Sequence, residues 1–204
     1  MKISSTIAVA SLALRAVATS PAREHVERQP ILGGGEVPIG TKTYTAGIHT
    51  TPDGITYCGG THYINGTKDG EQIKVVSAQN HTLNNVTIMS YDFALLTLEK
   101  PSKFTPIHLP KTDDSDIIAG MWTKVMMGWG DTSFPNGTRS NELQSVGLEI
   151  WNNKDCLPGF YVDNSSVCAG GAGGRDSCVG DTAGSLIKEK GQGDAGDILV
   201  GLVS

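Results

Sequence analysis

Glycine is spread along the whole chain, at 26 of its 204 residues, nearly twice its usual share. Together with turn signals such as Pro52-Asp53-Gly54 and Asn65-Gly66, it divides the apolar residues into short runs. In the run from Gln144 to Trp151, Val146, Leu148 and Ile150 alternate with Gly147 and Glu149, a period of two that predicts a strand. We therefore expect an all-β protein with tight turns and without a convincing helix.

Four further windows also have the composition of strands. The window Phe93–Leu98 is almost continuously apolar, which is typical of a strand buried on both faces. The most polar break in the middle of the chain runs from Lys111 to Asp116 and predicts a linker between two β units. The other windows are Gln72–Ser77, Thr123–Met127 and Asp197–Val203.

The charge balance excludes two classes of partner. With 16 Lys and Arg against 21 Asp and Glu, the net charge is −5, and no basic block occurs. Electrostatic binding to nucleic acid or to a membrane surface is therefore not expected. No apolar run approaches the roughly 18 residues that span a bilayer. None of the four histidines His49, His62, His81 and His108 stands beside another candidate metal ligand, and neither a metal nor a cofactor is expected.

The beginning of the chain has the pattern of a secretory signal. Lys2 precedes the apolar stretch Thr6–Leu14, and Ala16-Val17-Ala18 is a small-x-small cleavage site. This predicts a signal peptide over 1–18, a polar pro-segment or spacer over 19–30, and secretion. The alternative is a disordered cytosolic N-terminus. Five Asn-x-Ser/Thr sequons favour a glycosylated secreted protein, and they begin at Asn65, Asn80, Asn85, Asn136 and Asn164.

Three motifs in the chain resemble those of trypsin-like serine proteases. They are Ile31-Leu32-Gly33-Gly34, Tyr91-Asp92-Phe93-Ala94-Leu95-Leu96 and Asp176-Ser177-Cys178-Val179-Gly180-Asp181-Thr182-Ala183-Gly184. Thr182 follows Asp92 by 90 positions, against roughly 93 in the chymotrypsin template. Shorter matches are Cys58-Gly59-Gly60-Thr61, Gly128-Trp129-Gly130, Val167-Cys168-Ala169-Gly170 and Gly201-Leu202-Val203-Ser204. The resemblance implies two β-barrels packed across a cleft.

The resemblance assigns the first barrel to residues 31–112 and the second to residues 113–204. The chain stops at Ser204 inside an expected strand, before the family's remaining pocket wall and terminal helix. We therefore expect the second barrel to be incomplete at its C-terminus.

The same resemblance indicates a damaged catalytic triad. Asp92 matches the catalytic acid, but Thr61 leads directly into His62-Tyr63-Ile64, and the segment that carries the catalytic histidine is missing. Thr182 replaces the nucleophilic serine, and Ala183 replaces a glycine on a tightly turned backbone. A threonine hydroxyl needs a base to become a nucleophile. The protein is therefore expected to be inactive, with Asp92 and Thr182 as vestigial triad positions.

The remaining site residues are also implied by the family pattern. Asp176 matches the specificity residue for Arg or Lys, with a solvated loop carboxylate as the alternative. The backbone amides of Gly180 and Thr182 match the oxyanion donors, which need only main chain. Asp181 matches the acid that pairs with the new amino terminus after zymogen cleavage, although Pro30 makes tryptic cleavage before Ile31 unfavourable.

The four histidines beyond residue 30 are expected to be structural or on the surface. His49 precedes Asp92 by 43 positions, close to the roughly 45 of the template, but it lies before Cys58 and not after it. His62 follows Cys58 too closely to reach the cleft. His81 lies inside a sequon, and His108 lies near the linker.

The family pattern pairs only two of the four cysteines. Cys156 and Cys168 match a loop disulfide with both partners present. Cys58 and Cys178 match disulfides whose partners are absent, so both are expected to be unpaired. Each then marks a missing stretch of chain.

Among inactive trypsin-like proteins, the chain most resembles the oomycete glucanase inhibitor proteins. Its sequon-rich tract from Asn80 to Thr87 and the tract Gly66–Lys74 are similar to theirs. The resemblance implies an effector, secreted into the plant apoplast, that binds and inhibits a host endo-β-1,3-glucanase and so suppresses release of defence-eliciting glucan fragments. One alternative is an active trypsin-like endopeptidase represented by an incomplete sequence. Another is a nonfunctional product of a decayed gene.

Overall fold

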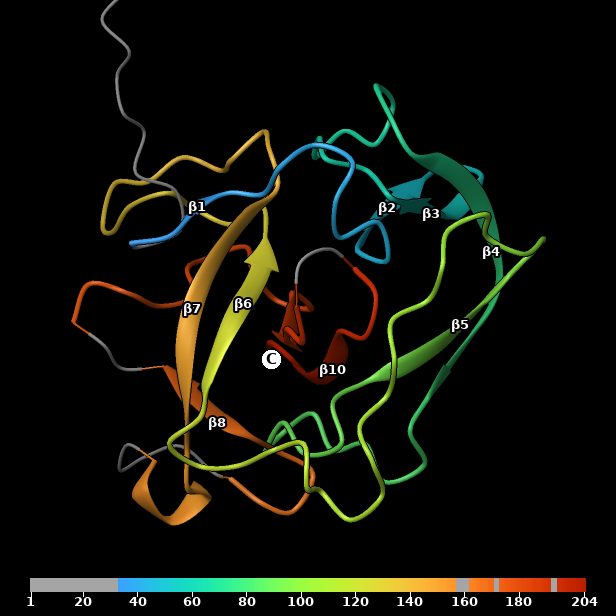
Figure 1. Cartoon of the computed structure of the whole chain (residues 1–204). Coiled ribbons are helices and arrows are strands. Elements are labelled where there is room, and N and C mark those ends of the chain that lie inside the picture. The colour runs from blue at the N-terminus through green and yellow to red at the C-terminus, as the bar shows by residue number, and fades with distance from the viewer. Residues whose placement is uncertain (1–32, 157–161, 171–172, 192–193) are drawn as a thin grey trace, which may run out of the picture.

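The computed structural model describes residues 33–156, 162–170, 173–191 and 194–204. The predicted signal peptide, the spacer and the Ile31-Leu32 part of the first motif lie outside these residues. Figure 1 shows the chain as two groups of strands, with β6, β7 and β8 on one side and β2 to β5 on the other.

The described part of the chain is built from strands, with one short 3-10 helix and no α-helix. The strands are β1 Gly35–Glu36, β2 Ala46–Thr51, β3 Gly54–Gly59, β4 Glu71–Asn80, β5 Ala94–Leu98, β6 Trp122–Gly128, β7 Gln144–Trp151, β8 Cys168–Gly170, β9 Ser185–Lys188 and β10 Ile198–Leu202. The 3-10 helix spans Asn153–Asp155. All five predicted strand windows coincide with observed strands.

The strands form two antiparallel sheets. The larger follows the order β1-β7-β6-β9-β10, with β8 also paired to β7, and the smaller follows β2-β3-β4-β5. The predicted linker 111–116 separates β5 from β6. Strand β1 precedes that linker yet pairs with β7. The beginning of the predicted first barrel therefore belongs to the larger sheet.

The hydrophobic core lies on both faces of the larger sheet. Because successive strand residues point to opposite faces, Met126 joins one apolar cluster while its neighbours Val125 and Met127 join the other. Leu186 and Ile187 divide between the same two clusters. The central strands β6 and β9 are therefore covered on both sides, whereas β7 buries one face, as its predicted alternation requires.

The smaller sheet buries much less, and here one prediction is wrong. Phe93–Leu98 was expected to be buried on both faces, but Leu95 is 70% exposed and Phe93 is 42% exposed. The cause is position, because β5 is an edge strand of this sheet. Leu96 and Leu98 are partly buried on one face, while the opposite face has no covering layer among the described residues.

The trypsin-like double-barrel architecture is present, with both sheets open in the described part of the chain. We predicted this only for the second barrel. In the first, β2 and β5 are free edges, and barrel closure requires that no edge remains. Between Thr61 and Asp92 the chain supplies a single strand, β4, which leaves the first barrel open as well.

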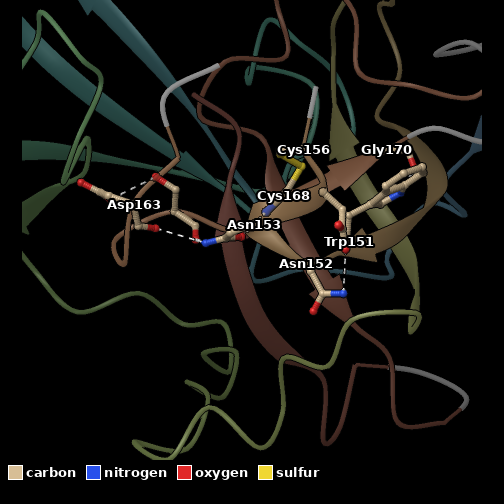
Figure 2. Close-up of a disulfide and its surroundings, with 9 residues drawn as sticks. Trp151, Asn152, Asn153, Cys156, Asp163, Cys168 and Gly170 are labelled. Atoms are coloured by element: carbon tan, nitrogen blue, oxygen red, sulfur yellow. Dashed lines mark hydrogen bonds between the residues drawn. A yellow bond between two sulfur atoms is a disulfide. The ribbon is translucent and has the colours of Figure 1, made fainter. Parts of the chain in front are cut away.

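The predicted disulfide joins Cys156 to Cys168, with Cα atoms 6.2 Å apart. It fastens the 3-10 helix to β8, and Figure 2 shows the hydrogen bonds around it. Asn153 Nδ2 donates to the carbonyl oxygen of Asp163 at 3.2 Å, and Trp151 Nε1 donates to that of Gly170 at 3.0 Å. The 3-10 helix, the 163–166 turn and β8 are thereby held together.

Candidate functional site

A cavity of about 390 Å³ lies where the nucleophile loop faces the smaller sheet. Its lining combines residues of β2 with residues of β9, β10 and the loop 180–184. Apolar side chains such as Ile64, Ile107 and Leu199 form much of its wall. Thr182, His49 and Arg139 also line the cavity, so we take it as the candidate functional site.

Asp92 lies just before β5, and its carboxylate accepts two side-chain hydrogen bonds. Its Oδ2 accepts a hydrogen bond from Ser204 Oγ at 2.8 Å, and its Oδ1 accepts one from Asn84 Nδ2 at 3.4 Å. The side chain is exposed and is not part of the cavity lining. Asp92 is therefore held by Ser204 and Asn84, and no histidine in the described part of the chain is bonded to it.

Thr182 sits at the apex of a tight turn. The turn is closed by the Asp181 amide donating to Cys178 O at 3.1 Å and the Gly184 amide donating to Asp181 O at 2.7 Å. Ala183 has φ +67°, a left-handed conformation in which its Cβ is unfavourable. The glycine of the family pattern would adopt this conformation without that cost.

Asp181 is buried beneath this turn, with only 1% of its surface exposed. Its two carboxylate oxygens accept the amides of Gly130 and Cys178, both at 2.8 Å. Burial raises its pKa, and the two amide hydrogen bonds oppose that rise. Its predicted partner, an amino terminus at Ile31, lies outside the described residues.

The two predicted oxyanion donors are free to bind. Within the described part of the chain, the amides of Gly180 and Thr182 donate no hydrogen bond. Gly180 has φ +96°, and the Arg139 Nε lies 3.2 Å from the place that a Cβ on Gly180 would occupy. The guanidinium group thus packs directly against the Gly180 backbone.

Of the histidines in the described part of the chain, only His49 lines the cavity. Its Nε2 lies 2.7 Å from the carbonyl oxygen of Ile64. A carbonyl only accepts, so Nε2 carries a proton and donates, and it has no lone pair for a nucleophile's proton. His49 is therefore held as a structural histidine at the cleft wall.

The other histidines lie outside this cavity. His62 is buried, with its Nε2 3.2 Å from Glu36 Oε1. His81 stacks on Tyr91 with ring centroids 4.7 Å apart. His108 is exposed and forms a backbone bridge to Ile198.

Asp176 is exposed and does not line the cavity. Its Oδ1 accepts the backbone amide of Ser177 at 2.8 Å. Asp176 therefore has the surroundings of a solvated loop carboxylate, which was the alternative to a specificity residue.

Cys58 and Cys178 are both free thiols. Burial raises the pKa of Cys58, which keeps the thiol protonated and unreactive. All five sequon asparagines are exposed, namely Asn65, Asn80, Asn85, Asn136 and Asn164. Their exposure makes each accessible for glycosylation.

Two residues of the site were missed from the sequence. The motif Gly201–Ser204 matches the family, but it does not by itself predict the hydrogen bond from Ser204 to Asp92. Arg139 follows a sequon in an ordinary surface loop, and no sequence signal marks it as a cleft residue. In the described part of the chain, no group of three or more His, Cys, Asp or Glu side chains could hold a metal ion. No helix there is long and apolar enough to cross a membrane.

Residues 54–204 match the family described as Trypsin. The chain therefore belongs to the trypsin family, as its two sheets and the Asp92–Ser204 contact also indicate.

Within that family, the chain is 68% identical to glucanase inhibitor protein 1 of Phytophthora infestans, covering 100% of this chain and 87% of the relative. It is 56% identical to glucanase inhibitor protein 2 of the same species, covering 100% of this chain and 88% of that protein. It is 53% identical to glucanase inhibitor protein 3 of Phytophthora sojae (strain P6497), covering 99% and 88%. It is thus a member of the group that these inhibitor proteins form.

The first of these alignments also bears on the missing segment. It extends over 230 positions, whereas the chain has 204 residues, so at least 26 positions (230 − 204) face gaps in this chain. The relative therefore contains internal residues that this chain lacks.

Proposed function

We propose that this protein is a secreted, catalytically inactive member of the trypsin family that binds and inhibits an endo-β-1,3-glucanase of a host plant. Binding in the apoplast would suppress the release of glucan fragments that elicit defence. The observation that carries the proposal is the 68% identity, over the whole chain, to a protein named glucanase inhibitor protein 1.

The geometry of the cleft supports the inactive part of the proposal. Thr182 is a secondary alcohol whose pKa is far above neutral pH, so it needs a base at hydrogen-bond distance. In the described part of the chain no base is hydrogen-bonded to its hydroxyl, and the Nε2 of His49 is already bonded to the carbonyl oxygen of Ile64. The free amides of Gly180 and Thr182 alone cannot activate the hydroxyl, although they can still bind an acceptor.

An inhibition assay tests the proposal. The chain is purified from the secreted fraction with its Cys156–Cys168 disulfide intact, and is titrated into a plant endo-β-1,3-glucanase that hydrolyses laminarin. We expect a dose-dependent loss of reducing-end release, together with co-precipitation of the two proteins. A heat-unfolded sample of the same chain is the control. Unchanged glucanase activity at micromolar excess of folded protein would contradict the proposal.

The second candidate function is a trypsin-like endopeptidase, and the presence of His49 and Thr182 in one cavity favours it. In that case the second ring nitrogen of His49, Nδ1, would accept the Thr182 proton. Turnover of Arg and Lys peptide substrates separates the two functions. We expect none above that of Thr182→Ala, whereas turnover that Thr182→Ala, His49→Ala and Asp92→Ala each abolish would establish the protease instead.

A further inference from the structure

Arg139 is a charged group at the cleft without a partner in the described part of the chain. It lies in the loop that closes by a backbone bridge between Asp131 and Arg139, and its side chain is exposed. It makes no ion pair with any described carboxylate, and it donates no hydrogen bond to a described residue. The guanidinium lies beside Gly180, with Nε 3.2 Å from the place that a Cβ on Gly180 would occupy.

Further hydrogen-bond donors face the same cavity. The amides of Gly180 and Thr182 and the Thr182 hydroxyl have no acceptor in the described part of the chain, and all belong to residues that line the cavity with Arg139. Asp181 is the one carboxylate among the lining residues. Its oxygens accept hydrogen bonds from the amides of Gly130 and Cys178, and it accepts none from these donors.

We propose that this cluster, the Arg139 site, receives an Asp or Glu side chain from a protruding loop of the glucanase. This inference rests on the proposed function and names the surface that carries it. A guanidinium binds a carboxylate through two parallel hydrogen bonds, and the free amides and hydroxyl can satisfy its remaining lone pairs. A buried arginine without such a partner would weaken an interface.

The shape and charge of the site support the same occupant. The cavity is concave and about 390 Å³ in volume, so it accepts a projecting side chain but not another hollow surface. The chain as a whole has a net charge of −5, so it has no general attraction for an acidic loop. Arg139 is the one Lys or Arg among the residues that line the cavity, and its charge therefore favours an acidic side chain at this place, which is how charge complementarity produces specificity.

Paired arginine variants test the inference. Arg139→Gln removes the charge at the cleft, and Arg175→Gln makes the same change at an exposed loop residue outside the cavity lining. We expect Arg139→Gln to weaken binding to the glucanase by about 30-fold or more, and Arg175→Gln by less than about two-fold. Circular dichroism and thermal unfolding verify that both variants fold like the parent chain.

A cross-linking experiment identifies the partner group. A water-soluble carbodiimide activates a carboxylate as an O-acylisourea, and a lysine amine displaces the urea to form an amide bond with loss of a proton. We expect Arg139→Lys to give an amide cross-link to one Asp or Glu of the glucanase, located by mass spectrometry. Arg175→Lys should give none.

The outcomes separate this inference from the proposed function. If the parent chain does not inhibit the glucanase, the proposed function fails. If the parent chain inhibits and Arg139→Gln inhibits equally well, the inference alone is overturned, and the free amides then bind a neutral carbonyl or stay empty. Absence of a cross-link from Arg139→Lys in a complex that still forms would also overturn it.

Discussion

The residues that match the catalytic positions of the family make separate contacts in this structure. Asp92 accepts a hydrogen bond from Ser204 at 2.8 Å, and Thr182 presents a hydroxyl beside two backbone amides that have no acceptor in the described part of the chain. No described base is hydrogen-bonded to that hydroxyl, which stays protonated at neutral pH unless a base activates it. This arrangement of donors agrees with the proposed binding function.

The left-handed backbone conformation of Ala183 predicts strain in the loop, and a substitution tests it. Its φ of +67° places an L-residue where left-handed geometry costs about 1–2 kcal/mol. We expect Ala183→Gly to raise the free energy of unfolding by about 0.5–1 kcal/mol, after the greater chain entropy of glycine is deducted. Urea denaturation measures the change.

The matched control is Ala94→Gly in strand β5, where φ does not fall in the left-handed region. There the same replacement should lower the free energy of unfolding by about 0.5–1 kcal/mol. A loss of stability for Ala183→Gly equal to that of Ala94→Gly would contradict the strain assigned to Ala183.

At this scale the sequence shows which residues occupy the site positions, but it does not show what surrounds each of them. The threonine at position 182 and the alanine at position 183 are read directly from the nucleophile-loop motif, because they concern which atoms are present. The cleft position of His49 and the free guanidinium of Arg139 depend on how separate loops pack. Sequence order gave His49 no catalytic role and did not locate it, and β2 places it on the cleft wall.

The strands differ sharply in what supports them. Ile187 in β9 is completely buried between β6 and β10, so both its hydrogen bonds and its apolar surface are satisfied. Leu95 in β5 is 70% exposed and has a neighbouring strand on one side only. An exposed apolar edge strand is a site at which chains associate.

A pair of truncations measures this difference. We expect Ile187→Ala to lower the free energy of unfolding by about 2–5 kcal/mol, because it leaves a cavity in a covered sheet. Leu95→Ala should change it by no more than about 0.5 kcal/mol, since most of that side chain is already in water. Chemical denaturation of the two variants tests both values, and equal costs would show that β5 is covered in solution.

The contrast explains why one strand prediction succeeded and another was wrong in part. In β7 the alternation of apolar residues reports a real difference between two faces, and the structure buries Val146, Leu148 and Ile150 as predicted. In β5 the continuous apolar run correctly indicates a strand, but burial also needs neighbouring layers. The sequence of β5 contains no information on whether those layers are present.

On the scale of the whole molecule, a buried ionic network joins the chain's two halves. Lys42 Nζ contacts Asp197 Oδ2 at 2.7 Å and Glu189 Oε1 at 2.6 Å, and the Tyr44 hydroxyl donates to the same Asp197 oxygen at 2.8 Å. Asp197 is fully buried. The network therefore ties the loop before β2 to the loop between β9 and β10. Four residues from two distant parts of the chain form it, and no local motif predicted it.

Lys42→Met tests the network, because methionine retains the apolar stem and removes the charge. The variant leaves Asp197 as a buried carboxylate without its cation, and we expect the free energy of unfolding to fall by about 3–5 kcal/mol. The exposed Lys154 is the matched control, and Lys154→Met should change stability by no more than about 0.5 kcal/mol. Adding Asp197→Asn to Lys42→Met should recover part of the loss.

The pH dependence of the same variant provides a second measurement. Burial alone would lower the pKa of Lys42, but the hydrogen bonds to Asp197 and Glu189 outweigh it and raise the pKa above its usual value. A raised pKa means that the folded protein binds this proton more tightly than the unfolded chain, whose lysines titrate near about 10.4. The stabilisation is therefore complete below about pH 10 and is lost as pH rises through the folded pKa. The difference in unfolding free energy between the parent chain and Lys42→Met should stay constant from pH 7 to 9 and shrink only in more alkaline solution. A difference that shrinks already below pH 9 would mean that the ammonium is not held by these two carboxylates.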